Sequence, residues 1–240
     1  MRVEIWADVV CPWCYIGKRR FESALARFAH RDEVEVVWRS FELDPTTESA
    51  RHVGDGPPYA DRLARKYSMS RAQAEQALAS TTAAAAGEGL EFHLDRALAA
   101  NTFDAHQVVV HVAAQRGRQA RVKERLMHAH FVEGEAVGDR ATLVRLAADA
   151  DLDADEVQRA LDTQEHADAV RADEAEAAAL GIRGVPFFVI DRRYGVSGAQ
   201  PPEHLLAALE QAWSERVPSP AVNAPAGGTE AVSGADGRAT

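Results

Sequence analysis

Residues 11–14 read Cys11-Pro12-Trp13-Cys14, and they stand between a short apolar run and a stretch with helical spacing. The run from Val3 to Val9 is rich in β-branched and aromatic residues, which is typical of a buried strand. From Tyr15 to Phe28, apolar residues recur every three or four positions, which predicts a helix. The two cysteines are therefore expected where a strand ends and a helix begins.

Two cysteines at the start of a helix have the chemistry that a redox centre needs. Thiol–disulfide exchange requires one thiolate that attacks and a second thiol that resolves the mixed disulfide. Free backbone N–H groups and the positive end of the helix dipole favour the anion of the first sulfur. We predict Cys11 as an exposed nucleophile and Cys14 as the resolving thiol. Pro12 and Trp13 lie between the sulfurs and are predicted to tune the pair and to contact the substrate.

A metal site and a structural disulfide are the other interpretations of this pair. Structural zinc sites need four ligands, and the chain has only two cysteines. The closest histidines, His128 and His130, stand two positions apart on an expected helix and so point to different faces. A disulfide across so short a loop would stabilise the fold very little. We therefore predict a catalytic pair and no metal.

The rest of the chain predicts a second strand, a long helical segment and a return to strands. Val34–Leu43 mostly alternates between apolar and polar residues, which predicts a strand. From Tyr59 to Leu180 only helical signals occur. Val185–Ile190 and Arg193–Val196 then predict a strand pair, and Glu203–Arg216 predicts a final helix. The order is β-α-β, a helical insert, and β-β-α, which is an α/β arrangement of thioredoxin-like type with a large insertion.

Capping residues divide the helical segment. The expected helix starts are Ser70 with Gln73, Thr102, Asp139, Asp153 with Glu156, and Gln164; the expected ends include Ala86, Gly117 and Gly181. We expect residues 1–45 and 182–217 to form one discontinuous thioredoxin-like domain and residues 57–181 a helical insertion domain. Residues 218–240, rich in Pro, Ala, Gly, Ser and Thr, are expected to be a disordered tail.

Composition limits the partners and the compartment. The formal charge of -10 argues against a nucleic-acid partner, which needs a basic face. No stretch approaches the roughly 18 apolar residues of a membrane span. The N-terminus lacks a basic segment followed by an apolar run, so we expect a cytoplasmic protein. In that compartment a lone cysteine pair is more often catalytic than structural.

Several motifs together resemble the DsbA-like thioredoxin family, and most closely its FrnE-like branch. The matching stretches are residues 8–17, 40–43, 101–106, 184–188 and 196–200. The resemblance implies a cis peptide bond between Val185 and Pro186 that faces the cysteines. The Val185 backbone would then be free to pair with an extended substrate. Both residues are therefore predicted to bind substrate.

The resemblance implies a thiol–disulfide oxidoreductase acting on a thiol or disulfide substrate, either a protein or a small molecule. Its redox-active disulfide would be its only cofactor, with glutathione as a candidate co-substrate. The chain is expected to be a monomer or a homodimer.

Two other functions remain open. The wider family includes glutathione-dependent chromene-carboxylate isomerases and kappa-class glutathione transferases, so an isomerase or transferase of aromatic small molecules is one alternative. Those relatives typically carry serine where Cys11 stands. A chaperone-like binding module with redox-sensing cysteines is the other. One of Asn101 and Thr102 is interpreted as the N-cap of the helix that follows, and His106 as a packed or surface residue. If the insert covers the cysteines, this segment would line the pocket.

Overall fold

The structure is a computed structural model that describes residues 1–216, except the side chains of residues 110 and 111. The predicted disordered tail, residues 218–240, and the last residue of the predicted thioredoxin-like domain lie outside the described residues. The strands are β1 (Arg2–Ala7), β2 (Glu35–Ser40), β3 (Phe187–Ile190) and β4 (Tyr194–Ser197). The helices are α1 (Pro12–Arg27), α2 (Tyr59–Lys66), α3 (Arg71–Gly87), α4 (Phe103–His106), α5 (Ala113–Gln115), α6 (Gln119–His128), α7 (Arg140–Asp149), α8 (Ala154–Thr163), α9 (Ala167–Ala179) and α10 (Pro202–Ser214).

The four strands form one mixed sheet in the order β2-β1-β3-β4. β1 runs parallel to β2 and antiparallel to β3, and β3 pairs with β4 across the predicted turn. On the central strand, Ile5 lies opposite both Trp38 and Phe188. This topology confirms the predicted order of β-α-β, helical insert and β-β-α, and with it the thioredoxin-like fold.

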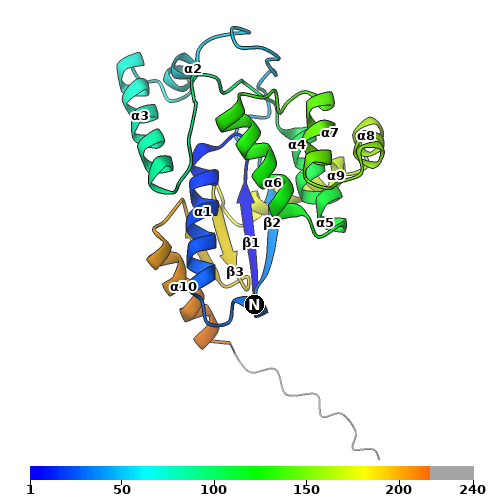
Figure 1. Cartoon of the computed structure of the whole chain (residues 1–240). Coiled ribbons are helices and arrows are strands. Elements are labelled where there is room, and N and C mark those ends of the chain that lie inside the picture. The colour runs from blue at the N-terminus through cyan, green and yellow to red at the C-terminus, as the bar shows by residue number, and fades with distance from the viewer. Residues whose placement is uncertain (217–240) are drawn as a thin grey trace, which may run out of the picture.

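Helices cover both faces of the sheet (Figure 1). On the face of α1 and α10, Ile5 and Phe188 join a large apolar core. On the opposite face, Trp6 packs with Ala177 of α9. The indole N–H of Trp6 also donates to the Asp173 carbonyl at 3.0 Å. The alternation of side chains along β1 thus buries this strand on both faces.

The inserted helices α2 to α9 gather around the end of β1 at which α1 begins (Figure 1). Val108, Leu126 and Leu146 belong to a second apolar core that holds much of this insertion together. In the part of the chain described here, residues 1–216, no helix is long and apolar enough to span a membrane. The insertion therefore adds its own core beside the end of the sheet.

The structure confirms three of the predicted helix caps. Ser70 and Gln73 form a capping box at the start of α3. Asp139 accepts from the Thr142 N–H at the start of α7. Asp153 accepts from the Glu156 N–H at the start of α8. Each of these side chains satisfies a backbone donor that the first turn of a helix leaves unpaired.

Several predicted boundaries are wrong. The first helix begins at Pro12, a residue that the sequence places in the first helical turn, but it ends at Arg27 rather than Phe28. The helix predicted from Thr102 to Gly117 is interrupted by a π-helical segment, Gln107–Val112. Gln164 does not start a helix but ends α8 in the left-handed conformation.

Further boundaries shift by smaller amounts, and α6 was not predicted as a separate helix. The strands predicted over Val3–Val9 and Val34–Leu43 end earlier, at Ala7 and Ser40. The helix predicted to end at Ala86 extends to Gly87.

The Glu124 carboxylate attaches α6 to the helix that follows the cysteines. It accepts from the Tyr15 hydroxyl at 2.5 Å, from the Lys18 ammonium at 2.6 Å and from the Arg19 guanidinium at 2.5 Å. Lys18 is almost fully buried, so its charge depends on carboxylates nearby, this one and that of Glu22. Glu124 thus joins three side chains of α1 to the insertion.

Glu124→Gln is expected to lower the free energy of unfolding by about 1–3 kcal/mol, because it removes the charge that accepts three hydrogen bonds. Chemical denaturation measures this difference. Glu75→Gln is the matched control, since Glu75 forms an exposed pair with Arg71 within one helix. That substitution should cost no more than about 0.5 kcal/mol. Equal losses in the two variants would contradict the assigned role of Glu124.

Candidate functional site

The two cysteines lie where the sequence predicts them, at the junction of β1 and α1. Cys11 is the N-cap of α1, and its backbone is extended. Its carbonyl accepts from the Cys14 N–H at 3.0 Å and from the Tyr15 N–H at 3.3 Å. Both cysteines are free thiols, and the first turn of the helix carries no acidic side chain. The dipole of α1 is therefore available to stabilise an anion at Cys11.

The prediction of an exposed Cys11 is wrong. Only 4% of Cys11 and 1% of Cys14 is accessible. Cys11 packs in the core between sheet and helices, and its Sγ donates to the Val185 carbonyl at 3.6 Å. Trp13, by contrast, is 41% exposed, so the motif reaches the surface mainly through its indole. The Cys11 sulfur is therefore largely covered, and Trp13 is the exposed part of the motif.

The Val185–Pro186 peptide bond is cis, as the resemblance implied, and it faces Cys11. The Pro186 carbonyl accepts from the Gly198 N–H at 2.8 Å, which ties this loop to the segment after β4. On its other side, Pro186 packs against Gly17 of α1. A Cβ added to Gly17 would lie 2.8 Å from Pro186 Cγ, closer than side chains can pack. The loop is therefore held directly against the helix that carries the cysteines.

Asp8 is a buried carboxylate three residues before Cys11. Its Oδ2 accepts from the Leu43 N–H at 2.8 Å, and its Oδ1 lies 3.5 Å from His106 Nε2. Burial acts to raise the pKa of Asp8. The His106 ring, the Leu43 N–H and the charge of Lys123 outweigh that effect and hold the pKa below its usual value. Asp8 is accordingly a carboxylate anion inside the protein.

The two sulfurs differ in their surroundings. Burial raises the pKa of Cys14 well above its usual value, and the neighbouring Cys11 raises it further. The Asp8 backbone N–H and the charge of Lys123 act in the opposite direction. Cys14 is therefore held as a neutral thiol beneath Cys11, which suits a resolving role.

The sequence analysis missed two buried polar groups behind the motif, Lys123, on which both sulfurs act, and His130, on which Asp8 acts. Lys123 is fully buried, and its Nζ donates to the Ala7 carbonyl at 3.0 Å. Burial lowers the pKa of Lys123 to about 8, although both sulfurs and Asp8 act to raise it. Lys123, Met127 and His130 follow one another at i, i+4 and i+7, and this spacing along the apolar face of α6 was the available signal.

Tyr59, at the start of α2, is another missed neighbour. Burial raises the pKa of its phenol, and the charge of Cys11 raises it further. The Arg62 guanidinium lies over its ring at 4.9 Å. The insertion thus places an aromatic hydroxyl within electrostatic reach of the first sulfur.

Residues 101–106 contribute a capping side chain at one end and a buried histidine at the other. The Asn101 side chain accepts from the Phe103 N–H at 3.1 Å and donates to the Pro45 carbonyl at 3.0 Å, so it caps the chain before α4. Thr102 is the N-cap residue but makes no side-chain cap bond. His106 is fully buried beside Asp8 and thus belongs to the polar cluster behind the cysteines.

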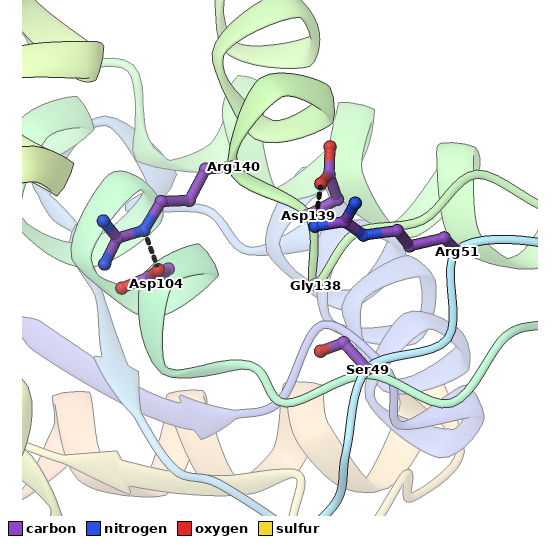
Figure 2. Close-up of a pocket in the computed structure, with 6 residues that line it drawn as sticks. All are labelled: Ser49, Arg51, Asp104, Gly138, Asp139 and Arg140. Carbon is purple, nitrogen blue, oxygen red and sulfur yellow. Dashed lines mark hydrogen bonds and ion pairs between the residues drawn. The ribbon is translucent and has the colours of Figure 1, made fainter.

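A separate hollow of about 290 Å³ lies within the insertion, and Figure 2 shows the residues that line it. Arg140 pairs with Asp104 at 2.6 Å, and Arg51 lies 3.8 Å from Asp139. The charges in this hollow are thus satisfied by one another, and its lining contains neither cysteine. Within residues 1–216, no cluster of three or more His, Cys, Asp or Glu side chains could hold a metal ion.

Gly17→Ala is expected to lower the free energy of unfolding by about 1–3 kcal/mol, because its methyl group would overlap the Pro186 ring. Thermal or chemical denaturation measures the loss. Gly87→Ala at the end of α3 is the control, since a Cβ there meets no atom within 4 Å. That variant should be neutral or slightly stabilised. A wild-type stability in Gly17→Ala would show that Pro186 is not held by this contact.

The buried His130 predicts a loss of stability in mild acid. Burial lowers its pKa to about 4 from the usual 6.5, so the unfolded chain binds a proton that the folded chain excludes. The stabilisation is complete above pH 6.5 and is lost as the pH falls to 4, by about 3 kcal/mol. Denaturation at several pH values should show a smaller drop for His130→Gln. The control His128→Gln, at an exposed ring, keeps the buried histidine and should retain the drop.

Comparison with known proteins agrees with the fold. The sequence profile of the DSBA-like thioredoxin domain matches residues 2–210. The structure of a probable DsbA oxidoreductase from Streptomyces coelicolor is 48% identical, with a TM-score of 0.84 over 98% of this chain and 100% of that one.

Two more distant relatives show the breadth of the likeness. The uncharacterized protein YwbO of Bacillus subtilis (strain 168) is 26% identical over 79% of this chain and 86% of its own length. The cytosolic disulfide reductase DsbM from Pseudomonas aeruginosa, solved with GSH, is 19% identical. It has a TM-score of 0.62 over 89% of this chain and 100% of that one, a likeness of fold. With the family profile matching nearly all of the described residues, the chain belongs to the DsbA-like thioredoxin family.

Proposed function

We propose that this protein is a thiol–disulfide oxidoreductase in which Cys11 is the nucleophile and Cys14 the resolving thiol. The observation that carries the proposal is the asymmetric pair of free thiols at the start of α1. Cys11 lies at the positive end of the helix, facing Val185, whereas Cys14 is more deeply buried and neutral. This asymmetry supports Cys11 as the sulfur that meets the substrate and Cys14 as the sulfur that follows it.

The exchange has two steps. The Cys11 thiolate attacks a substrate disulfide, which forms a bond between Cys11 and one substrate sulfur and releases the other as a thiolate. Cys14 then loses its proton and attacks the Cys11 sulfur. The intramolecular disulfide forms, and the second substrate thiolate leaves. Run in reverse, the same steps oxidise a dithiol, and the reduction potential of the pair relative to its compartment sets the direction.

The substrate is expected to contact Pro12, Trp13, Val185 and Pro186. Trp13 offers exposed apolar surface beside the sulfur, and the Val185 backbone faces Cys11. An extended thiol-containing chain could pair with that backbone by strand addition. Glutathione is the small thiol that we propose as co-substrate, with support from the related fold of DsbM, which was solved with GSH.

We keep the cytoplasm as the proposed compartment. A chain whose two cysteines are both in the motif has no structural disulfide to maintain there. The monomeric or homodimeric state stays a prediction.

A glutathione-dependent isomerase is the competing function, and Cys14 separates the two. An isomerase needs glutathione bound at the site but has no use for a resolving thiol. Disulfide exchange fails to complete without one.

Cys11→Ser is expected to abolish the glutathione-dependent reduction of insulin, because the attacking sulfur is lost. Cys14→Ser is expected to accumulate a mixed disulfide between Cys11 and glutathione, visible by intact-protein mass spectrometry and reversible with a reductant. The double variant contains no thiol at all and supplies the baseline. Full insulin reduction by Cys11→Ser would contradict the proposal. Turnover of an aromatic substrate by Cys14→Ser without any mixed disulfide would favour the isomerase.

A further inference from the structure

Lys123 is a fully buried lysine with few polar contacts. Its Nζ donates to the Ala7 carbonyl at 3.0 Å and lies 5.1 Å from the centre of the Trp38 ring. Removing an ammonium from water is costly unless nearby groups compensate it. A single carbonyl and one aromatic face compensate only a small part of this cost. The positive charge of Lys123 therefore depends on charged groups nearby.

The Ala7 carbonyl belongs to the peptide group whose N–H also acts on the pKa of the resolving cysteine. A peptide group is planar and trans, so its C=O and N–H point in opposite directions. The C=O of the Ala7–Asp8 peptide accepts from Lys123 at 3.0 Å, and the N–H of the same peptide acts to lower the pKa of Cys14. Ammonium, peptide and sulfur therefore form one chain of donors and acceptors. Hydrogen bonds in such a chain polarise one another, most strongly in a dry interior.

We infer that Lys123 is a positioning residue for disulfide exchange, which acts through the Ala7–Asp8 peptide to stabilise the thiolate of Cys14 when that sulfur attacks. The inference rests on the proposed function and adds a residue to it from the helical insertion. Lys123 touches no substrate. Its effect passes through one amide and through its charge.

The charged and titratable groups around Lys123 agree with this role. Cys14 and Cys11 from α1, Asp8 from the end of β1 and Asp173 from α9 all act to keep Lys123 charged. His106 is the titratable group that faces Asp8 from the insertion. Asp8 has hydrogen-bond partners of its own in Leu43 and His106, so it does not neutralise the ammonium alone. These groups thus keep the positive charge of Lys123 close to the sulfurs of Cys11 and Cys14, which become thiolates during exchange.

The charge has two consequences for exchange. When Cys14 gives up its proton and attacks the Cys11–substrate disulfide, the negative charge on its sulfur is stabilised, and resolution is faster. In the reduced pair the same ammonium favours thiolate, whereas in the neutral disulfide it has nothing to stabilise. Lys123 therefore makes the pair easier to reduce.

Lys123→Met keeps the side-chain length and removes the charge and the donor. Resolution of the Cys11–glutathione mixed disulfide should slow about tenfold. The equilibrium with glutathione should shift about tenfold toward the intramolecular disulfide, which is a potential about 30 mV more negative. The thiolate absorbance of the reduced protein should also titrate at higher pH. Lys123→Gln, a smaller change that retains a donor without charge, should show the same direction and serves if the methionine variant does not fold.

Lys18→Met is the matched control. Lys18 is also a buried lysine near the cysteines in sequence, but its ammonium is paired with Glu22 and Glu124. Lys18→Met should leave the reduction potential of the cysteine pair and the rate at which the mixed disulfide is resolved near their wild-type values. A folded, active Lys123 variant with unchanged potential, resolution rate and thiolate titration would overturn the inference. If wild-type protein reduces no disulfide at all, the proposed function itself fails, and this inference with it.

Discussion

A buried carboxylate at the end of β1 fixes the chain on both sides of the redox motif. Asp8 binds the Leu43 N–H beyond β2 through Oδ2, and its own carbonyl accepts from the Cys11 N–H at 3.3 Å. His106 approaches it from the insertion. Because a buried charge without partners costs several kcal/mol, these contacts must form together. Asp8 therefore links the segment just before Cys11 to the chain beyond β2 through its carboxylate, and it contacts Cys11 itself through its backbone carbonyl.

This arrangement gives the sulfurs of Cys11 and Cys14 different surroundings. The chain turns at Asp8 into α1, which leaves Cys11 at the positive end of the helix and carries Cys14 inward by one turn. The inner sulfur meets the low dielectric of the core, where a thiolate is unfavourable. The outer sulfur meets the Val185 carbonyl. The proposed order of attack and resolution rests on this difference in surroundings, since the Cys-x-x-Cys spacing alone would allow either sulfur to begin.

Local sequence patterns predicted the structural features that depend on neighbouring residues. They failed for features that depend on contacts between residues far apart in the sequence. The strand–helix junction at Cys11, the strand pair near Pro186 and the cap at Ser70 each follow from a few adjacent side chains. The burial of Cys11 does not, because the covering groups come from elsewhere in the chain. Lys123 is the clearest case: lysine is usually exposed, and its partner carbonyl lies 116 residues away. The π-helical break before α5 was missed because its residues keep an apolar pattern.

The insertion does more than cover the site, because it supplies most of the polar groups behind the cysteines. The sheet provides Asp8, and the groups that compensate it and the sulfurs, His106 and Lys123, come from inserted helices. Without the insertion, the carboxylate would keep the Leu43 N–H as its strong partner and lose both of the side chains that lower its pKa. The cysteine motif would remain, but its electrostatic surroundings would not. The chemistry therefore belongs jointly to the thioredoxin-like sheet and to the helices inserted into it.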